Sequence, residues 1–403
     1  MVNVAILGFG TVGSGVAEVL AKNGGLIDQR ADELIRLKYI LDVRDFPDSP
    51  YRDRFVKDFS VIEQDPEVNI VVETIGGATI ALDFTTRALK AGKSVVTSNK
   101  ELVATHGYEL LQLAHKNGCS YLFEASVGGG IPILRPLTSC LAANELTQVT
   151  GILNGTTNYI LTRMIKAGLT FDQALKEAQD NGYAEKDPTA DVDGHDACRK
   201  ICILSALAFG RQVYPDQVPT QGIRDVTLED VAYAGSADYK IKLLGRAIRQ
   251  PEGKVCAFVA PHLVPGDNPL AGVEDVFNAI AVRGNAIGDV MFYGRGAGKL
   301  PTASAVVADV IDIAKDLKRD HRNDWAEGSP DLVVSPDVLT SQWYVRTGAS
   351  VEQVRAACGE VHLLARSGAP AGETAFLTGS MTGPELRKRL EGMEVRSQFR
   401  VLA

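Results

Sequence analysis

Residues 2–20 read VNVAILGFGTVGSGVAEVL, and this stretch decides the fold of the N-terminal part of the chain. The apolar run at residues 2–7 predicts a buried strand, and the amphipathic residues 16–20 predict a helix after the glycines. A strand, a G-x-G-x-x-G turn and a helix in this order form the phosphate-binding unit of doubly wound dinucleotide-binding domains.

Each glycine of the turn has a separate role in such a unit. The first allows the tight turn, the second lets a pyrophosphate approach the backbone, and the third lets the helix pack on the strand. Free N–H groups at the start of the helix then hold the phosphates. A glycine-rich turn without a ligand is the alternative. The predicted cofactor contacts are Gly8, Phe9, Gly10, Thr11, Val12 and Gly13.

Four later apolar runs predict the other strands of an α/β, doubly wound domain. They are residues 39–43, 69–72, 94–97 and 121–123, with a helix at 79–91. In such sheets the ligand lies beyond the carboxyl ends of the strands, which places Thr74 and Lys100 along the cofactor groove. A solvated side chain is the alternative for Lys100.

The end of the second predicted strand bears on the choice of cofactor. An acidic side chain there binds the ribose hydroxyls of NAD, whereas an arginine favours the 2′-phosphate of NADP. The chain offers Asp42, Arg44 and Asp45 together. We predict NADP, bound through Arg44, and the acids leave NAD as the alternative.

Residues 124–132 read EASVGGGIP, with three consecutive glycines. Such glycines free the backbone to turn its carbonyl oxygens inward, where they can hold a cation. A hinge between domains explains them equally well. Further on, residues 151–159 read GILNGTTNY and predict a strand, a polar turn and a helix that starts at Tyr159.

Residues 182–205, GYAEKDPTADVDGHDACRKICILS, concentrate acids just before an apolar helix. Asp196 and Lys200 lie four residues apart, on one helical face. This arrangement suits a small polar substrate with an amino group and a lysine that moves a proton. The alternative is a capped helix start with one ion pair worth about 0.2–0.5 kcal/mol.

Composition excludes several classes of protein. The 403 residues indicate two or three domains. The net charge of −8 argues against nucleic acid. No apolar run approaches the roughly 18 residues of a membrane span, and no export signal precedes the first strand. The six cysteines are scattered, without the second pair that a zinc site needs, so we expect reduced thiols in a cytoplasmic protein.

Five motifs taken in order resemble homoserine dehydrogenase: GFGTVG, SNKELVA, EASVGGGIP, GILNGTTNYI and GYAEKDPTADVDGHDACRK. The resemblance covers roughly residues 1 to 320. It implies NAD(P)-dependent interconversion of L-homoserine and L-aspartate 4-semialdehyde, in the biosynthesis of threonine and methionine. Hydride transfer to an aldehyde produces an alkoxide, which needs a proton-bearing neighbour, and a lysine suits this role.

The resemblance also implies roles for single residues. Lys200 is implied to be the catalytic proton donor, with Asp196 one turn earlier to orient it, and Lys100 to lie beside nicotinamide and substrate. The implied substrate-binding residues are Glu185, Tyr183, Gly155, Thr156 and Asp191. The implied site for a monovalent cation, Na⁺ or K⁺, comprises Glu124, Val127, Gly129 and Ile131, mostly through main-chain oxygens. Gly298, in a glycine loop at 294–298, is implied to contact the cofactor. His195 departs from the apolar residue expected of the family at that position, and we expect it to lie beside the pocket without a catalytic role.

The resemblance and the pattern together give a division into domains. A Rossmann domain is expected at 1–130, with a return helix at about 299–319. An α+β catalytic and dimerisation domain is expected at 131–298, and a linker at 320–340. Residues 341–403 predict a β-α-β-β-α-β order, which is ferredoxin-like and resembles the ACT regulatory module. The link at 347–350 lacks the Asp-x-x-Gly turn at which ACT domains bind amino acids, so feedback by threonine is not expected.

Two other functions remain open from the residues alone. An oxidoreductase for another amino-acid semialdehyde or amine shares the glycine turn but has no reason to carry the residues from Glu185 to Lys200. A non-catalytic dinucleotide sensor with an ACT-like module binds cofactor without turnover. The expected partners are the small-molecule substrate and further copies of the chain, as a homodimer or homotetramer, with neither nucleic acid nor membrane.

Overall fold

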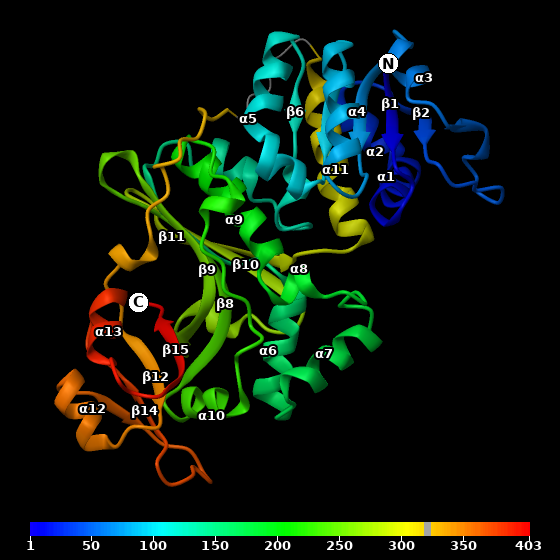
Figure 1. Ribbon diagram of the computed structural model, residues 1–403. Helices are drawn as coiled ribbons and strands as arrows, with labels where there is room; N and C mark the ends of the chain where they lie inside the picture. Colours follow the sequence, from blue (N-terminus) through cyan, green and yellow to red (C-terminus); the bar gives the residue numbers. More distant parts are fainter. Residues whose placement is uncertain (318–323) are drawn as a thin grey trace. The chain divides into compact units, whose positions relative to one another are not determined.

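A computed structural model describes residues 1–317 and 324–403 (Figure 1). The chain divides into two compact units. The first comprises Met1–Glu145, Cys202–Pro215 and Gly294–Ser329, and the second comprises Leu146–Ile201, Asp216–Tyr293 and Pro330–Ala403. Among the described residues, no helix combines the length and the apolar character needed to cross a membrane.

The first unit contains a six-stranded parallel sheet in the order β3-β2-β1-β4-β5-β6. The strand order reverses between β1 and β4, which is where doubly wound sheets bind dinucleotides. The predicted Rossmann fold of the N-terminal part is therefore confirmed. The strands are β1 Val2–Leu7, β2 Ile35–Leu41, β3 Phe55–Val56, β4 Val68–Glu73, β5 Ser94–Thr97 and β6 Tyr121–Leu122.

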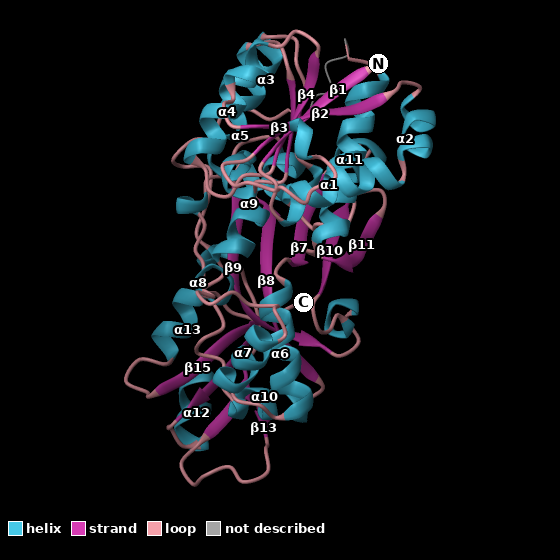
Figure 2. Ribbon diagram, turned by 90° about the vertical axis from the view of Figure 1, so that its right-hand side faces the viewer, coloured by secondary structure: helices cyan, strands magenta, loops and turns pink. Residues whose placement is uncertain are grey.

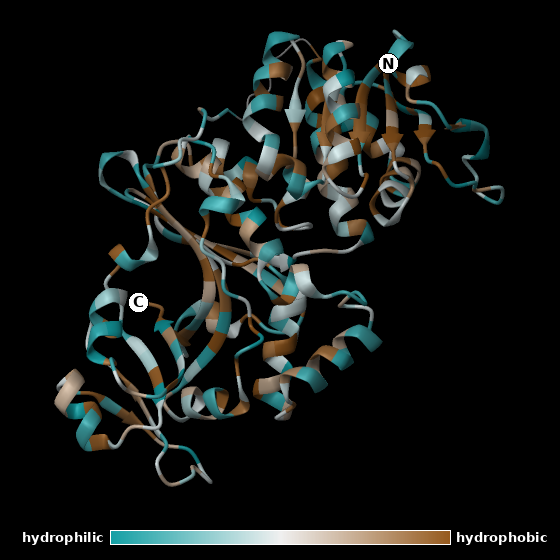
Figure 3. Ribbon diagram, in the orientation of Figure 1, coloured by the Kyte–Doolittle hydropathy of each residue, from teal (hydrophilic) through white to brown (hydrophobic). Residues whose placement is uncertain are grey.

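Helices cover both faces of this sheet. Helices α4 and α5 lie on one side, and α1, α2 and α11 lie on the other (Figure 2). The central strands β1 and β4 are mainly hydrophobic (Figure 3), as expected for strands buried on both faces. Val306 and Val310 of α11 share one apolar cluster with Val4 and Ile6 of β1. The helices are α1 Thr11–Lys22, α2 Gly24–Ala31, α3 Ser60–Gln64, α4 Thr79–Lys90, α5 Lys100–Lys116 and α11 Lys299–Lys315.

The second unit contains a nine-stranded mixed sheet in the order β11-β10-β7-β8-β9-β15-β12-β14-β13. Strand β15 runs parallel to β9 and so joins the C-terminal strands to the others. The strands are β7 Leu146–Ile152, β8 Tyr239–Arg249, β9 Val255–Pro265, β10 Phe277–Gly284, β11 Gly288–Arg295, β12 Trp343–Thr347, β13 His362–Leu364, β14 Thr374–Leu377 and β15 Val395–Val401.

Helices α6 and α10 pack on β8. Helix α6 begins at Gly155, four residues before the predicted start at Tyr159. The prediction was wrong because the cap lies earlier: the side chain of Asn154 accepts the N–H of Thr157. The helices are α6 Gly155–Ala167, α7 Phe171–Asp180, α8 Thr189–Val192, α9 His195–Phe209, α10 Leu228–Ser236, α12 Val351–Cys358 and α13 Gly383–Arg389.

The C-terminal elements follow the predicted order, β12-α12-β13-β14-α13-β15. They do not form a sheet of their own, because β15 pairs with β9. Of the predicted linker, residues 320–323 lie outside the described residues. Trp325 is buried, and Ala326 and Val333 form bridges to Arg211 and Val255. The described part of this segment is therefore packed against the rest of the chain.

Candidate active site

The glycine turn has the tight geometry that the sequence predicted. Gly8 has a φ of +87°, which favours glycine. A Cβ on Gly13 would lie 1.9 Å from the carbonyl oxygen of Gly8, so no larger residue fits there. A Cβ on Gly10 would meet nothing within 4 Å, so the backbone is open at this point. These are the properties that the approach of a pyrophosphate requires.

Asp42 and Arg44 follow β2 directly and form a fork of hydrogen bonds. Nε and Nη2 of Arg44 donate to the Asp42 carboxylate at 3.1 and 3.0 Å. The N–H of Phe9, in the glycine turn, donates to the same carboxylate at 2.7 Å. Burial by itself raises the pKa of Asp42, but these bonds outweigh burial and hold the pKa at about 2. Asp42 is therefore an anion that fixes Arg44 beside the glycine turn.

Lys57 supports the same segment, a role that the sequence did not predict. Its ammonium donates to the carbonyl oxygens of Asp42, Val43 and Arg44 at 3.1, 3.1 and 2.6 Å. It also forms an ion pair with Asp45 at 2.8 Å. No sequence pattern pointed to this contact, because a lysine directly after a short strand is usually a solvated side chain.

Thr74 and Lys100 lie at the carboxyl ends of β4 and β5, as predicted. The Thr74 hydroxyl contacts the carbonyl oxygens of Leu7 and Gly8, both at 2.9 Å. Thr74 therefore fixes the backbone at the start of the glycine turn. Lys100 is the first residue of α5, and the side chain of Asn99 caps that helix by accepting the N–H of Leu102 at 3.1 Å.

Two glycine segments of the first unit meet backbone to backbone. The N–H of Gly130 donates to the carbonyl of Arg295 at 3.1 Å, and a Cβ on Gly129 would lie 2.5 Å from Gly296 O. Gly298, with a φ of +132°, immediately precedes α11. A Cβ on Gly15 of α1 would lie 2.8 Å from the carbonyl oxygen of Lys299, so the start of α11 lies against α1.

The carboxylate of Glu124 is occupied by main-chain donors. It accepts the N–H groups of Ile133, Leu134 and Arg135 at 2.6, 2.9 and 2.8 Å. Its side chain therefore holds the backbone of residues 133–135 in place. Within the described ranges, no group of three or more His, Cys, Asp or Glu side chains is arranged to hold a metal ion.

Lys200, on α9 of the second unit, is buried, and its ammonium uses only part of its hydrogen-bonding capacity. Its ammonium donates to Asp196 Oδ2 and to the carbonyl oxygen of Leu153, both at 2.7 Å. An ammonium has three donors, and among the described residues no acceptor reaches the third. One N–H of Lys200 is thus available to a ligand.

Asn154 joins the acids that surround Lys200. Its side-chain amide donates to Asp191 at 2.7 Å and to Asp196 at 2.9 Å. Burial, and then the charge of Asp196, raise the pKa of Asp191 above its ordinary value. The sequence predicted Asn154 only as part of a polar turn, because an N-cap at a helix start explains the residue fully.

The loop that follows α7 carries the predicted substrate-binding residues Tyr183 and Glu185. The Thr156 hydroxyl donates to the carbonyl of Tyr183 at 2.7 Å, and Gln179 donates to the carbonyl of Glu185 at 3.1 Å. The carboxylate of Glu185 is exposed, and no hydrogen bond or ion pair from the described part of the chain reaches it. His195 is exposed at the start of α9.

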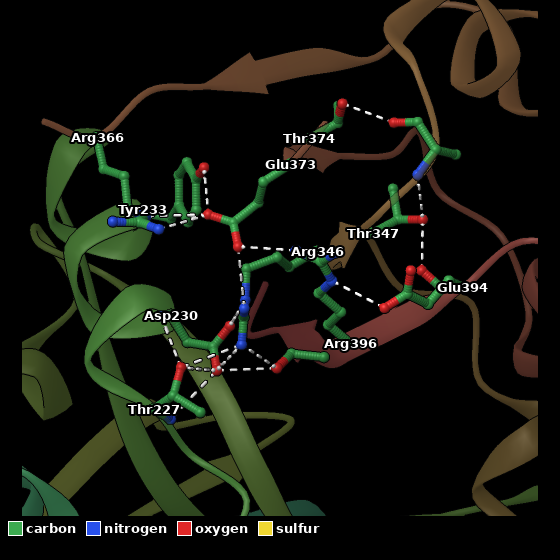
Figure 4. A network of polar contacts seen from close by, with 12 residues as sticks. Thr227, Asp230, Tyr233, Arg346, Thr347, Arg366, Glu373, Thr374, Glu394 and Arg396 are labelled. Atoms are coloured by element: carbon green, nitrogen blue, oxygen red, sulfur yellow. Dashed lines mark hydrogen bonds and ion pairs between the residues drawn. The ribbon is translucent and has the colours of Figure 1, made fainter. Parts of the chain in front are cut away.

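A second buried polar network joins α10 to the C-terminal strands (Figure 4). Arg346 of β12 donates to Asp230 at 2.8 Å and to Glu373 at 3.2 Å. Glu373 also accepts from Arg366 and Tyr233 at 2.6 and 3.0 Å. Burial opposes ionisation of Glu373, but these bonds bring its pKa down to about 2.

Comparison with known proteins identifies the family. The sequence model described as "Homoserine dehydrogenase, NAD binding domain" matches residues 8–124, and that described as "Homoserine dehydrogenase" matches residues 132–311. The chain is 41% identical over 352 residues to the homoserine dehydrogenase of Lactococcus lactis, covering 85% of this chain and 82% of that protein. The chain belongs to the homoserine dehydrogenase family.

Other members of the family give the same result. The homoserine dehydrogenase of Bacillus subtilis is 42% identical over 322 residues, which cover 79% of this chain and 74% of that protein. The crystal structure of the Thiobacillus denitrificans homoserine dehydrogenase superposes with a TM-score of 0.90 at 34% identity, covering all of this chain and 98% of the other. An archaeal homoserine dehydrogenase solved with NADPH has a TM-score of 0.67 at 30% identity, covering 80% and 99%.

Membership of the homoserine dehydrogenase family decides between the functions that the residues alone left open. The chain is an oxidoreductase with an NAD(P)-binding domain. The alternative of a sensor without turnover is not supported. Five of the six cysteines are buried, and Cys140 is exposed.

Proposed function

We propose that this homoserine dehydrogenase uses Lys200 to move the proton at the reacting oxygen of L-homoserine and L-aspartate 4-semialdehyde. The observation that carries the proposal is the incomplete hydrogen bonding of a buried ammonium. Asp196 and the carbonyl of Leu153 hold two of its donors and aim the third. Leaving a buried donor unused costs roughly 1–3 kcal/mol, so a ligand that accepts it gains affinity.

Proton and hydride movements are divided between the chain and the cofactor. When bound, the nicotinamide ring supplies or accepts the hydride. As the aldehyde carbon is reduced, charge develops on its oxygen, and Lys200 donates a proton to that oxygen. This leaves Lys200 as the neutral amine, and in the reverse direction that amine receives the proton of the homoserine hydroxyl and becomes the ammonium again. Asp196 keeps the Lys200 nitrogen in place in both directions, because it accepts one of its N–H groups at 2.7 Å.

The amino-acid end of the substrate is assigned to the loop after α7. Glu185 presents an exposed carboxylate without a partner from the described residues, which suits the ammonium of the substrate. Gly155 and Thr156 at the start of α6 and Tyr183 complete this end of the site. Asp191, held by Asn154 at 2.7 Å, adds a second acceptor close to Lys200.

For the cofactor we propose NADP in preference to NAD. The support is the fork between Arg44 and Asp42, which already engages both oxygens of that carboxylate. An acid in that state is a poor acceptor for ribose hydroxyls. Arg44 keeps Nη1 for a phosphate, and Lys57 adds a second cation to the segment. The glycine turn, Thr74 below it and Gly298 at the start of α11 hold the remaining part of the dinucleotide.

A monovalent cation, Na⁺ or K⁺, remains part of the proposal at Glu124, Val127, Gly129 and Ile131. Its ligands would be mostly main-chain oxygens, since the Glu124 carboxylate already accepts three N–H groups. The positive φ of Gly129, +52°, turns the backbone in a way that most residues disfavour.

The C-terminal elements are proposed to be an ACT-like module without an amino-acid ligand. The three N–H groups of its first turn are all used inside the chain. Gly348 donates to the Glu394 carbonyl at 3.0 Å, Ala349 to the Thr347 hydroxyl at 3.1 Å and Ser350 to Gln353 at 2.8 Å. A ligand carboxylate therefore finds no free donor at this turn.

We also propose that the enzyme is a homodimer or homotetramer. The support is the edge strand β11, which exposes 41% of Met291 and 55% of Tyr293. Exposed apolar side chains on an unpaired strand edge favour association with a second copy.

One assay tests the catalytic proposal. The chain is incubated with L-homoserine and NADP or NAD, and absorbance at 340 nm is followed. Reduction of NADP that requires homoserine is expected, and adding threonine should leave the rate unchanged. Binding of NADPH without turnover of homoserine would contradict the proposed reaction.

A further inference from the structure

A buried carboxyl group lies beneath the turns that are proposed to face the cofactor. Glu73 is the last residue of β4, and its side chain is fully buried, at 0% exposure. One carboxylate oxygen accepts the N–H of Ile75 at 2.6 Å, and the other accepts the hydroxyl of Thr97 at the end of β5. Glu73 therefore connects the ends of two neighbouring strands.

Asn99 closes the connection into a ring. The oxygen of the Thr97 hydroxyl accepts the N–H of Asn99 at 2.9 Å. The amide of Asn99 donates back to the carbonyl oxygens of Ile75 and Gly77 at 3.2 and 2.7 Å. The bonds from Thr97 to Glu73 and from Asn99 to Ile75 and Gly77 cross between the turn after β4 and the turn after β5, whereas those at the N–H groups of Ile75 and Asn99 order each turn locally. The first of these turns begins with Thr74 and the second ends at Lys100.

Burial of the Glu73 carboxyl group destabilises the folded state when the group is ionised. No ion pair reaches Glu73 from the described residues, and burial raises its pKa to about 7. From β6, the hydroxyl of Tyr121 lies near Glu73 and is itself buried without a hydrogen-bond partner. A buried acid without a counter-charge is destabilising, so packing alone does not account for its presence.

We propose that Glu73 is a positioning residue for the cofactor. Through its two hydrogen bonds it holds the turn at Thr74–Gly77 and the start of α5 in the arrangement that binds the nicotinamide nucleotide. The inference rests on the proposed placement of Thr74 and Lys100 at the cofactor. It does not depend on Lys200 as the proton donor, because its test measures binding without substrate.

The test compares three variants by NADPH fluorescence titration in the absence of homoserine. Glu73→Gln keeps an acceptor for Ile75 and offers a donor to Thr97, so its Kd should stay within about threefold of wild type. Glu73→Met removes both bonds, and its Kd should rise by about tenfold or more, since one net hydrogen bond is worth up to roughly tenfold. Thr97→Val removes one link and should raise the Kd by an intermediate factor.

Thermal denaturation separates positioning from folding. Glu73→Met should keep its midpoint within about 3 °C of wild type, because losing a costly buried charge offsets two lost bonds. A folded Glu73→Met variant that binds NADPH like wild type overturns the proposal. So does a folded Glu73→Gln variant that binds as weakly as Glu73→Met. If Glu73→Met does not fold, Thr97→Val decides, and wild-type affinity in that variant overturns the inference.

Lys100→Met distinguishes this inference from the proposed role of Lys100. Wild-type turnover in Lys100→Met would contradict only the role of Lys100. Weaker NADPH binding in Glu73→Met would then still support Glu73 as a positioning residue for the cofactor.

Discussion

Two buried polar networks of the second unit differ in how completely their charges are satisfied. In the C-terminal network, Arg346 meets both Asp230 and Glu373, and Glu373 meets Arg366 as well (Figure 4). Around Lys200, the ammonium meets Asp196 and one carbonyl and keeps one donor unused. The first network is closed and the second is open.

The difference separates stability from function. A closed network contributes only when it is complete, and breaking it leaves an uncompensated buried charge. An open network leaves a position where a substrate supplies the missing acceptor. Burial is alike in the two cases, at 7% exposure for Arg346 and 8% for Lys200, so burial alone does not identify the active site.

The largest expected effect is the loss of turnover when the ammonium of Lys200 is removed from the open network. Lys200→Met should lower kcat by about 10²–10⁴, the usual contribution of a general acid or base, and should leave the Kd for NADPH near wild type. Lys176→Met is the matched control, since Lys176 forms an exposed ion pair with Asp180 at the same i,i+4 spacing. Turnover of Lys200→Met within a factor of ten of wild type would remove Lys200 from the mechanism.

Breaking the closed network should cost stability instead. Arg346→Met leaves Asp230 and Glu373 without their shared cation, at a cost of about 3–5 kcal/mol in the free energy of unfolding. Chemical denaturation measures this loss. At denaturant concentrations below the midpoint of unfolding, the kcat of Arg346→Met should remain within about threefold of wild type. An unchanged denaturation curve would show that the network contributes nothing.

Arg44 is an intermediate case, with part of its guanidinium bound to Asp42. Arg44→Ala should weaken NADP more than NAD, by about 1.5–3 kcal/mol, the usual value of a hydrogen bond to a charged group. Titration of both cofactors against wild type and variant gives the ratio. Equal losses for NADP and NAD would show that Arg44 does not bind the 2′-phosphate.

Glu185 is the exposed acid that is proposed to bind the ammonium of the substrate. Glu185→Gln keeps the shape of the side chain and removes its charge, so KM for homoserine should rise by about tenfold while kcat changes less. The matched control is Glu394→Gln, an exposed acid of the C-terminal network paired with Arg396. KM and kcat both at wild-type values would leave Glu185 without a role in substrate binding.

The smallest effect concerns Glu73 and depends on pH. Burial raises the pKa of Glu73 to about 7, so the folded state holds this proton more tightly than the unfolded state does. The contribution of protonated Glu73 to the free energy of unfolding is fully present below pH 4.5, the ordinary pKa of a glutamate. It is lost as the pH rises through 7. Glu73→Gln should therefore be more stable than wild type at pH 8, with a smaller difference at pH 5. The reverse order in thermal denaturation at the two pH values would contradict the assignment.

The parts of the fold that follow local rules were predictable. Strands β1 and β5 match their apolar runs, and the glycine turn determines where α1 begins. The start of α6 was not predicted, because its cap, Asn154, precedes a glycine and two threonines that weaken the helical pattern. The joining of β15 to β9 is a contact between distant segments, and no local pattern encodes it.

The site was predictable in its residue types and less so in its contacts. The spacing of Asp196 and Lys200 on one helical face predicted their ion pair, which the structure has at 2.7 Å. The contacts of Asn154, Lys57 and Glu73 join residues far apart in the sequence. Each of these residues also has an ordinary local explanation, which is why sequence patterns did not single them out.

The most direct test is a single comparison of kcat for Lys200→Met and Arg346→Met, at a temperature where both variants are folded. The contrast between an open and a closed network predicts at least a hundredfold loss for Lys200→Met and a change of less than about threefold for Arg346→Met. Equal losses in the two variants, or wild-type turnover in Lys200→Met, would contradict it.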